Sequence, residues 1–133
     1  MAKQFTLGKQ ERLKSRKLLE QVFREGKVFS QFPFKVFYIP VSHKQRLMFG
    51  VGVSRKHFKK ATDRNRIKRL VREAYRVQKK ELLHTLEMKN RQLAVFFIYT
   101  GKDLPDFGLA AEKTSVVLKR LCAIIHENDS STT

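Results

Sequence analysis

Apolar residues recur at helical spacing near both ends of the chain. The first stripe predicts a short helix from Arg16 to Glu25, with Ser15 as its N-cap and Gly26 ending it in the left-handed conformation. The second stripe, which includes Cys122, predicts a helix from Leu109 to His126. We therefore expect two amphipathic helices that each place one face on a core.

Between these helices, apolar and β-branched residues predict strands. The expected strands are residues 27–30, 34–39, 47–54 and 92–99. A further long helix, with Thr62 or Asp63 as its N-cap, is expected to run to about Glu87. The order α-β-β-β-α-β-α predicts a single α+β domain, a sandwich of helices and a four-stranded sheet over residues 1–127, with a basic arm at 1–14. Residues 128–133 contain no apolar side chain and are expected to form a disordered tail.

Charge is the feature that narrows the function. The 133 residues contain 29 Lys and Arg against 12 Asp and Glu, a net charge of +17. Positive side chains in such excess repel one another, and an excess of this size is typical of proteins that bind a polyanion. The single cysteine, Cys122, excludes an intrachain disulfide, and no apolar run is long enough for a membrane span. With no apolar signal sequence at the N-terminus, we expect a cytoplasmic protein that binds a polyanion and has no membrane-spanning segment.

The positive charge is concentrated in the long helix. Residues 55–80 contain 12 basic and 2 acidic side chains. On a helical wheel, eight cations between Arg64 and Lys80 share one face, while Ile67, Leu70 and Val71 lie on the other. Cations one turn apart repel each other, so such a face is poorly suited to stability alone. Arginines suit phosphate geometry, and Asn65 can bond a sugar or a base edge, which favours RNA binding.

A second binding surface is predicted on the sheet. Lys35, Phe37 and Ile39 share one face of their strand, and Phe23 on the first helix is expected to face them. A lysine beside aromatic rings offers a charge for the RNA backbone and a stacking surface for single-stranded bases. The alternative, that Phe23 and Phe37 belong only to the core, stays open from the residues alone.

The same segments carry a family resemblance. Residues 64–74, RNRIKRLVREA, resemble the RNR signature of the bacterial ribonuclease P protein subunits. Residues 11–13, 22–26 and 49–56 match the same family in order and spacing, so the resemblance covers roughly residues 5–125. It implies a left-handed β-α-β crossover, although the general rule favours right-handed connections. Two positions depart from the family pattern, Leu19 where a second aromatic is common and Lys59-Lys60 where Gly-Asn is usual.

The resemblance implies an accessory protein of an endoribonuclease that removes the 5′ leader of precursor tRNA. The RNA subunit would carry the chemistry and most of the Mg²⁺, so no catalytic or metal-binding residue is expected in the protein. The implied partners are ribonuclease P RNA and precursor tRNA, with no membrane and no DNA. The residues matched to binding of the RNA subunit are Arg64, Asn65, Arg66, Lys68, Arg69 and Arg72. The residues matched to leader binding are Phe23, Lys35, Phe37, Arg55 and Lys56.

Other readings of the chain are weaker. A protein-borne metal nuclease would need clustered carboxylates, but Asp103 and Asp106 flank Pro105 as turn formers do, and the four histidines are scattered. Cys122 falls on an apolar stripe and is expected in the core. The alternative from another class is a structural RNA-binding protein of the ribosomal type. It would have the same charge but no effect on precursor cleavage.

Overall fold

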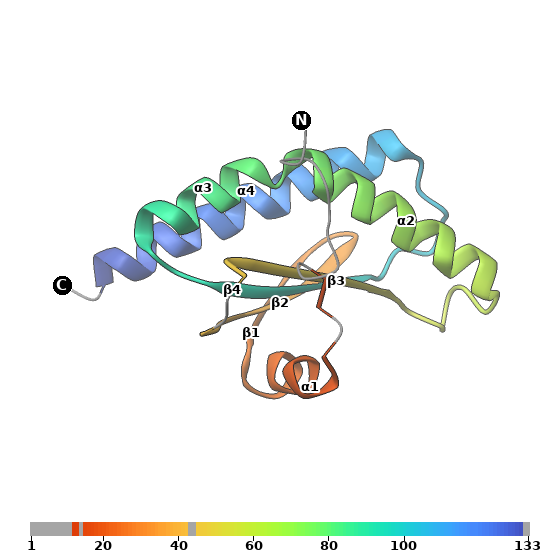
Figure 1. Cartoon of the computed structure of the whole chain (residues 1–133). Coiled ribbons are helices and arrows are strands. Elements are labelled where there is room, and N and C mark those ends of the chain that lie inside the picture. The colour runs from red at the N-terminus through yellow and green to blue at the C-terminus, as the bar shows by residue number, and fades with distance from the viewer. Residues whose placement is uncertain (1–11, 14, 43–44, 132–133) are drawn as a thin grey trace.

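The structure is a computed structural model that describes residues 12, 13, 15–42 and 45–131. These residues form four strands and four helices in the order α-β-β-β-α-α-β-α (Figure 1). The elements are α1 (Arg16–Glu25), β1 (Lys27–Gln31), β2 (Phe34–Pro40), β3 (Leu47–Val53), α2 (Ala61–Gln78), α3 (Lys80–Lys89), β4 (Leu93–Tyr99) and α4 (Phe107–Ser131). The predicted α+β class and all four predicted strands are confirmed. Of the expected basic arm, only residues 12 and 13 lie within the described part of the chain.

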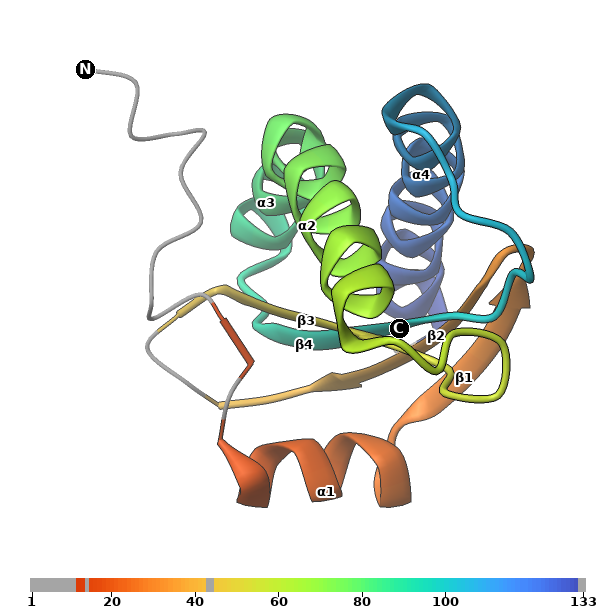
Figure 2. The same ribbon diagram turned by 90° about the vertical axis from the view of Figure 1, so that its right-hand side faces the viewer.

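The sheet has the order β1-β2-β4-β3. β2 is antiparallel to both β1 and β4, with Val36 opposite Phe97, and β3 is parallel to β4, with Phe49 opposite Val95. A parallel pair needs a crossover connection, and here α2 and α3 provide it. Figure 2 shows these two helices and α4 on one face of the sheet and α1 on the other.

The main core lies between the sheet and the three-helix layer. Alternate residues of β2, β3 and β4 point into it and meet the apolar sides of α2, α3 and α4. Phe49 and Tyr75 stack there with ring centroids 3.8 Å apart. A smaller cluster on the opposite face joins Leu13 and Val22 to Met48 and Ala94. The sheet is therefore buried on one face and only partly covered on the other.

The ends of α1 show one prediction confirmed and one wrong. Ser15 is the N-cap, and its Oγ accepts a hydrogen bond from the Leu18 backbone N–H at 3.3 Å. Gly26 ends the helix in an extended conformation, φ −72° and ψ 160°, and not in the left-handed one. Glycine is required by space, because a Cβ here would lie 2.3 Å from the Val22 carbonyl oxygen and 2.9 Å from that of Tyr38.

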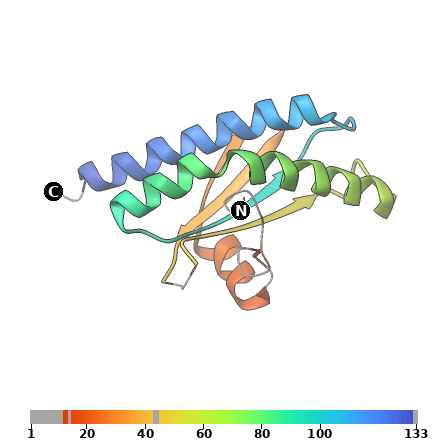
Figure 3. The ribbon, with the colours of Figure 1, turned by 45° about the horizontal axis from the view of Figure 1, so that its top comes forward.

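The single long helix expected up to Glu87 is divided in two at Lys79, so that prediction was wrong. α2 ends at Gln78, whose side-chain amide donates to the carbonyl oxygens of Ala74 and, on α4, Ala111, both at 3.0 Å. Lys79 is only 2% exposed, although the wheel placed it among the surface cations. α3 then runs alongside α4 (Figure 3). It buries Leu82 and Leu86. A helical wheel assumes one straight helix axis, so it could not show the break at Lys79.

α4 is longer than predicted. It begins at Phe107 and continues to Ser131, so the segment expected as a disordered tail is helical as far as that residue; residues 132 and 133 lie outside the described part. Asp106 starts the helix by accepting a hydrogen bond from the Leu109 N–H at 2.8 Å. In the described part of the chain, no helix is long and apolar enough to cross a membrane.

Candidate nucleic-acid interface

α2 presents the predicted basic surface. Its apolar side buries Ile67, Val71, Ala74 and Tyr75 against the core. This packing fixes the rotation of the helix and turns its other side outward. We define the cationic helix face as Asn65, Arg66, Lys68, Arg69 and Arg72. Asn65, Arg66 and Arg69 are exposed, and Lys68 and Arg72 are half-buried, so five of the six residues predicted to bind the RNA subunit lie together and reach solvent.

Arg64, the sixth, has a structural task that the helical wheel could not show. Its Nη1 donates to the carbonyl oxygens of Phe58 and Lys59, each at 2.8 Å. Thr62 and Asp63 do not cap α2 as expected, because the helix starts earlier and its N-cap, Lys60, makes no side-chain capping bond. The Arg64 guanidinium therefore ties the preceding loop to the first turn of α2.

That loop carries two of the residues predicted to bind the leader. Arg55 and Lys56 are exposed in the turn after β3, where the Lys56 N–H donates to Ser54 Oγ at 3.3 Å. Because β3 and β4 are parallel, their last residues lie at the same end of the sheet. Lys35 lies opposite Ile98 near that end, so all three basic residues belong to the same end of the sheet.

Further along α2, the positive surface is partly neutralised. Arg76 forms an ion pair with Glu73 through two hydrogen bonds, one of them Nε to Oε2 at 3.0 Å. These bonds lower the pKa of Glu73 and raise that of Arg76. With Lys79 buried as well, the exposed charge is strongest in the first half of α2.

The face of the sheet that carries α1 is covered at one end only. α1 packs on β2 and β4, where its Val22 joins a cluster with Met48 and Ala94, and among the described residues the far end of this face stays partly exposed. We define the open sheet face as the residues of β2, β3 and β4 that share this side from the edge of α1 outward: Lys35, Phe37, Gly50, Gly52, Phe96 and Ile98. Its surface is apolar and aromatic with a basic rim.

Three aromatic rings meet on the open sheet face. Phe23 of α1 contacts Phe37 and Phe96 edge to face, with ring centroids 4.9 and 5.1 Å apart. Phe37 and Phe96 are half-buried, while Phe23 keeps 43% of its surface exposed. Lys35 Nζ lies 5.5 Å from the Phe37 ring centre. Phe23 of α1 is thus brought together with Phe37 and Lys35 of β2, as predicted, and the rings are partly core and partly surface.

Phe96 was missed by the sequence reasoning. It lies in a nearly continuous apolar run that predicts a strand buried on both faces. The signal that could have identified it is the Gly50-Val51-Gly52 sequence of the neighbouring strand. Without side chains at positions 50 and 52, β3 leaves room for the Phe96 ring, whose atoms lie within 3.3 Å of where a Cβ of either glycine would stand.

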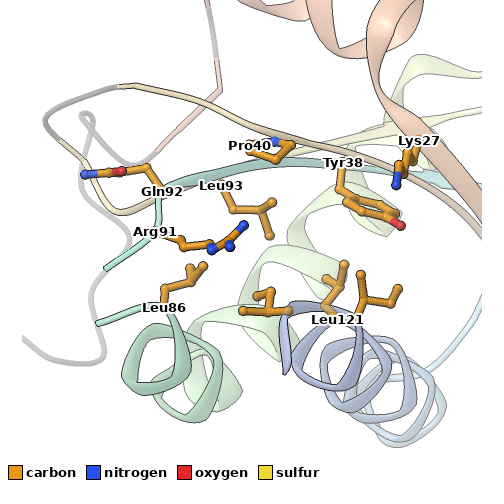
Figure 4. Close-up of a pocket in the computed structure, with 10 residues that line it drawn as sticks. Lys27, Tyr38, Pro40, Leu86, Arg91, Gln92, Leu93 and Leu121 are labelled. Atoms are coloured by element: carbon orange, nitrogen blue, oxygen red, sulfur yellow. The ribbon is translucent and has the colours of Figure 1, made fainter. Parts of the chain in front are cut away.

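A small pocket lies on the other side of the sheet and is separate from this interface. Figure 4 shows it between the Tyr38 and Leu93 side chains of the sheet and Leu86 and Leu121 of α3 and α4. Its volume is about 60 Å³. Its lining is chiefly apolar and belongs to the packing of the helix layer on the sheet. Among the residues that the structure describes, no three His, Cys, Asp or Glu side chains are grouped as metal ligands would be.

Comparison with known proteins supplies the family. The family model for ribonuclease P matches residues 7–121. The chain is 40% identical over 106 residues to the ribonuclease P protein component of Porphyromonas gingivalis, covering 77% of each protein. It is 32% identical over 129 residues to that of Chlorobium phaeobacteroides, covering 87% of this chain and 88% of the relative.

Solved structures agree with this assignment. The RNase P protein from Thermotoga maritima superimposes with a TM-score of 0.64 at 30% identity, covering 83% of this chain and 96% of that one. The Staphylococcus aureus RNase P protein has a TM-score of 0.67 at 21% identity, covering 82% and 93%, which supports the fold.

Proposed function

The chain belongs to the ribonuclease P protein family, and from this membership we propose that it binds the catalytic RNA subunit and the 5′ leader of precursor tRNA. In this proposal the RNA subunit carries the chemistry and holds most of the Mg²⁺. The protein assists endonucleolytic removal of the leader by binding, and no side chain of the protein reacts.

The cationic helix face supports the contact with the RNA subunit. Its arginines project from a helix fixed by a buried apolar side, so their guanidinium groups are held in a set order along one surface. Arginine binds phosphate through paired hydrogen bonds, and each phosphate neutralised releases counterions. Affinity for the RNA subunit should therefore fall steeply as salt concentration rises.

The open sheet face supports the contact with the leader. A leader is single-stranded and varies in sequence, so its binding site needs stacking surfaces and backbone charge more than base-specific hydrogen bonds. The partly exposed Phe23 ring provides the first, and Lys35, Arg55 and Lys56 provide the second. This aromatic surface with its basic rim is the observation that carries the leader-binding proposal, because a purely structural RNA-binding protein would not need it.

The proposal predicts a specific effect on cleavage. Phosphate repulsion between the RNA subunit and precursor tRNA is screened by Mg²⁺, and a protein that adds positive charge reduces the Mg²⁺ that is needed. The test is precursor cleavage by the cognate RNA subunit at low and high Mg²⁺, with and without the protein. We expect strong stimulation that fades as Mg²⁺ rises. Salt-sensitive RNA binding without stimulation would instead indicate a structural RNA-binding protein, and cleavage by the protein alone would contradict both readings.

A further inference from the structure

Two arginines from distant parts of the sequence line one hollow at the edge of the sheet. Arg12 forms a parallel bridge with Phe49, and the next backbone N–H, that of Leu13, donates to the Phe49 carbonyl oxygen at 2.9 Å. This short pairing holds Arg12 against the edge of β3. Arg72 belongs to α2, which packs over the same strand. The hollow between them is open, with a volume of about 100 Å³.

The hollow is positively charged. Its remaining lining residues are apolar or glycine: Leu13, Phe49, Gly50, Val51 and Phe96. No carboxylate is among the described residues that line it. Burial lowers the pKa of Arg72, and the positive charge of Arg12 lowers it further. Two like charges that share a partly buried hollow destabilise each other unless an anion lies between them.

We propose that Arg12 and Arg72 together bind one phosphate group of an RNA backbone. Two guanidinium groups can each direct paired N–H donors at phosphate oxygens, which a lysine cannot do. This inference rests on the proposed function, since it takes the ligand to be the RNA of that complex. It adds a residue outside the signature helix, Arg12, and gives Arg72 a partner.

The location of the hollow gives the bound phosphate a role. Arg72 belongs to the cationic helix face, while Gly50 and Phe96 belong to the open sheet face, and the hollow touches all three. A phosphate held here lies at the junction of the two surfaces. It would fix the RNA strand that passes from one to the other and so set the position of the leader relative to the RNA subunit. The phosphate can come from the RNA subunit or from the leader.

The test is a double-mutant cycle with Arg12→Gln, Arg72→Gln and the double variant. Affinities are measured over a salt series for the RNA subunit alone, for precursor tRNA in the holoenzyme, and for mature tRNA. Lys119→Gln, which removes one exposed positive charge from α4, is the matched control. We expect each single variant to lose about tenfold in affinity, with a salt slope lower by about one. The double variant should lose little more than either single variant, because one shared contact is already gone.

The outcomes identify which RNA supplies the phosphate, and they distinguish failure of this inference from failure of the proposed function. A loss seen with the RNA subunit alone assigns the phosphate to that RNA, and a loss confined to precursor tRNA assigns it to the leader. Additive losses of affinity would overturn the shared site, and so would an Arg12→Gln variant that binds RNA as tightly as the Lys119→Gln control. In either case the wild-type protein would still stimulate cleavage. Failure of the proposed function would appear differently, as no stimulation by the wild-type protein.

A measurement on the free protein gives a second check. Inorganic pyrophosphate should raise the Tm of the wild-type protein and raise that of Arg12→Gln less, because the variant lacks half of the site. Without the anion, Arg12→Gln should unfold at the same temperature as the wild type or higher, since the repulsion between the arginines is relieved. An equal pyrophosphate shift in both proteins would contradict the site.

Discussion

The Phe96 ring lies directly over Gly50, so closely that a Cβ at position 50 would stand 2.7 Å from Phe96 Cδ2. The same ring contacts Phe23, with centroids 5.1 Å apart. Glycine in β3 therefore determines where Phe96 lies, and Phe96 in turn supports the exposed ring of α1. This relationship links a backbone position in the sheet to the surface proposed to bind the leader.

Replacing Gly50 by alanine should disturb that surface. The added methyl group must displace the Phe96 ring or the strand, and overpacking of this kind costs about 1–3 kcal/mol. We expect Gly50→Ala to lower the free energy of unfolding by that amount and to reduce affinity for precursor tRNA more than for the RNA subunit. Denaturant unfolding and binding titrations measure the two effects.

Gly52→Ala is the matched control, because its Cβ would lie at 3.2 and 3.3 Å from Phe96, where a small shift suffices. It should have the smaller effect in both measurements. Equal losses for the two alanine variants would contradict the role assigned to Gly50.

Truncation of the aromatic rings should separate leader binding from assembly. Phe23 is the most exposed of the three rings, so Phe23→Ala removes stacking surface at little cost to the core. We expect precursor tRNA to lose about 1–3 kcal/mol of binding free energy for the stacked base. Mature tRNA and the RNA subunit should bind as before.

Phe37→Ala should show the same preference and also lower the free energy of unfolding, because this ring is half-buried in the smaller core cluster. If both variants weaken precursor and mature tRNA equally, the rings are core alone. Phe23→Tyr, which keeps the ring, should restore discrimination.

The sequence predicted local features better than the relationships between them. The Ser15 cap, the apolar stripes and the strands follow from residue types within a few positions, and the structure bears them out. The division at Lys79 does not follow in this way, because it depends on Gln78 reaching a carbonyl of α4. A helical wheel shows only the direction in which each side chain points from the helix axis. It contains no information on the hydrogen-bond partners that a neighbouring helix provides.

The same reason separates the site residues that were found from those that were missed. Arg66 and Arg69 were recognised because the helix itself turns them outward. Phe96 and Arg12 were not, since their positions depend on a neighbouring strand, through Gly50 in one case and a backbone bridge to Phe49 in the other. Such contacts join residues far apart in the chain.

Cys122 should make stability fall at alkaline pH. Burial raises the pKa of its thiol, and the bond from the Thr85 hydroxyl, 3.6 Å from Sγ, opposes this only in part. The native thiol therefore keeps its proton at a pH where the unfolded one has lost it. This contribution to stability is complete below about pH 9 and is lost as the pH rises through the native pKa.

Chemical denaturation at a series of pH values tests this. Cys122→Ala should be less stable throughout because of the lost side-chain volume, but its stability should decline less steeply above pH 9 than that of the wild type. A decline remaining at higher pH is expected from Tyr38 and Tyr99, whose pKa values burial also raises. Parallel curves for the two proteins would show that the thiol does not contribute.

Arg64 and Arg66 should respond to substitution in opposite ways although they are two residues apart in the same signature. Arg64 donates to two loop carbonyl oxygens at 2.8 Å, whereas Arg66 is exposed on the cationic helix face. Hydrogen bonds from a charged donor contribute about 1.5–3 kcal/mol, so Arg64→Gln should lower the free energy of unfolding by about that amount. Arg66→Gln should leave stability unchanged within about 0.5 kcal/mol, weaken binding to the RNA subunit and lower the salt slope by about one.

Thermal unfolding of the free protein and salt-dependent binding titrations, run on both variants, measure the contrast. If Arg64→Gln is fully stable and loses RNA affinity as Arg66→Gln does, then Arg64 acts on the RNA, and its bonds to the loop are incidental.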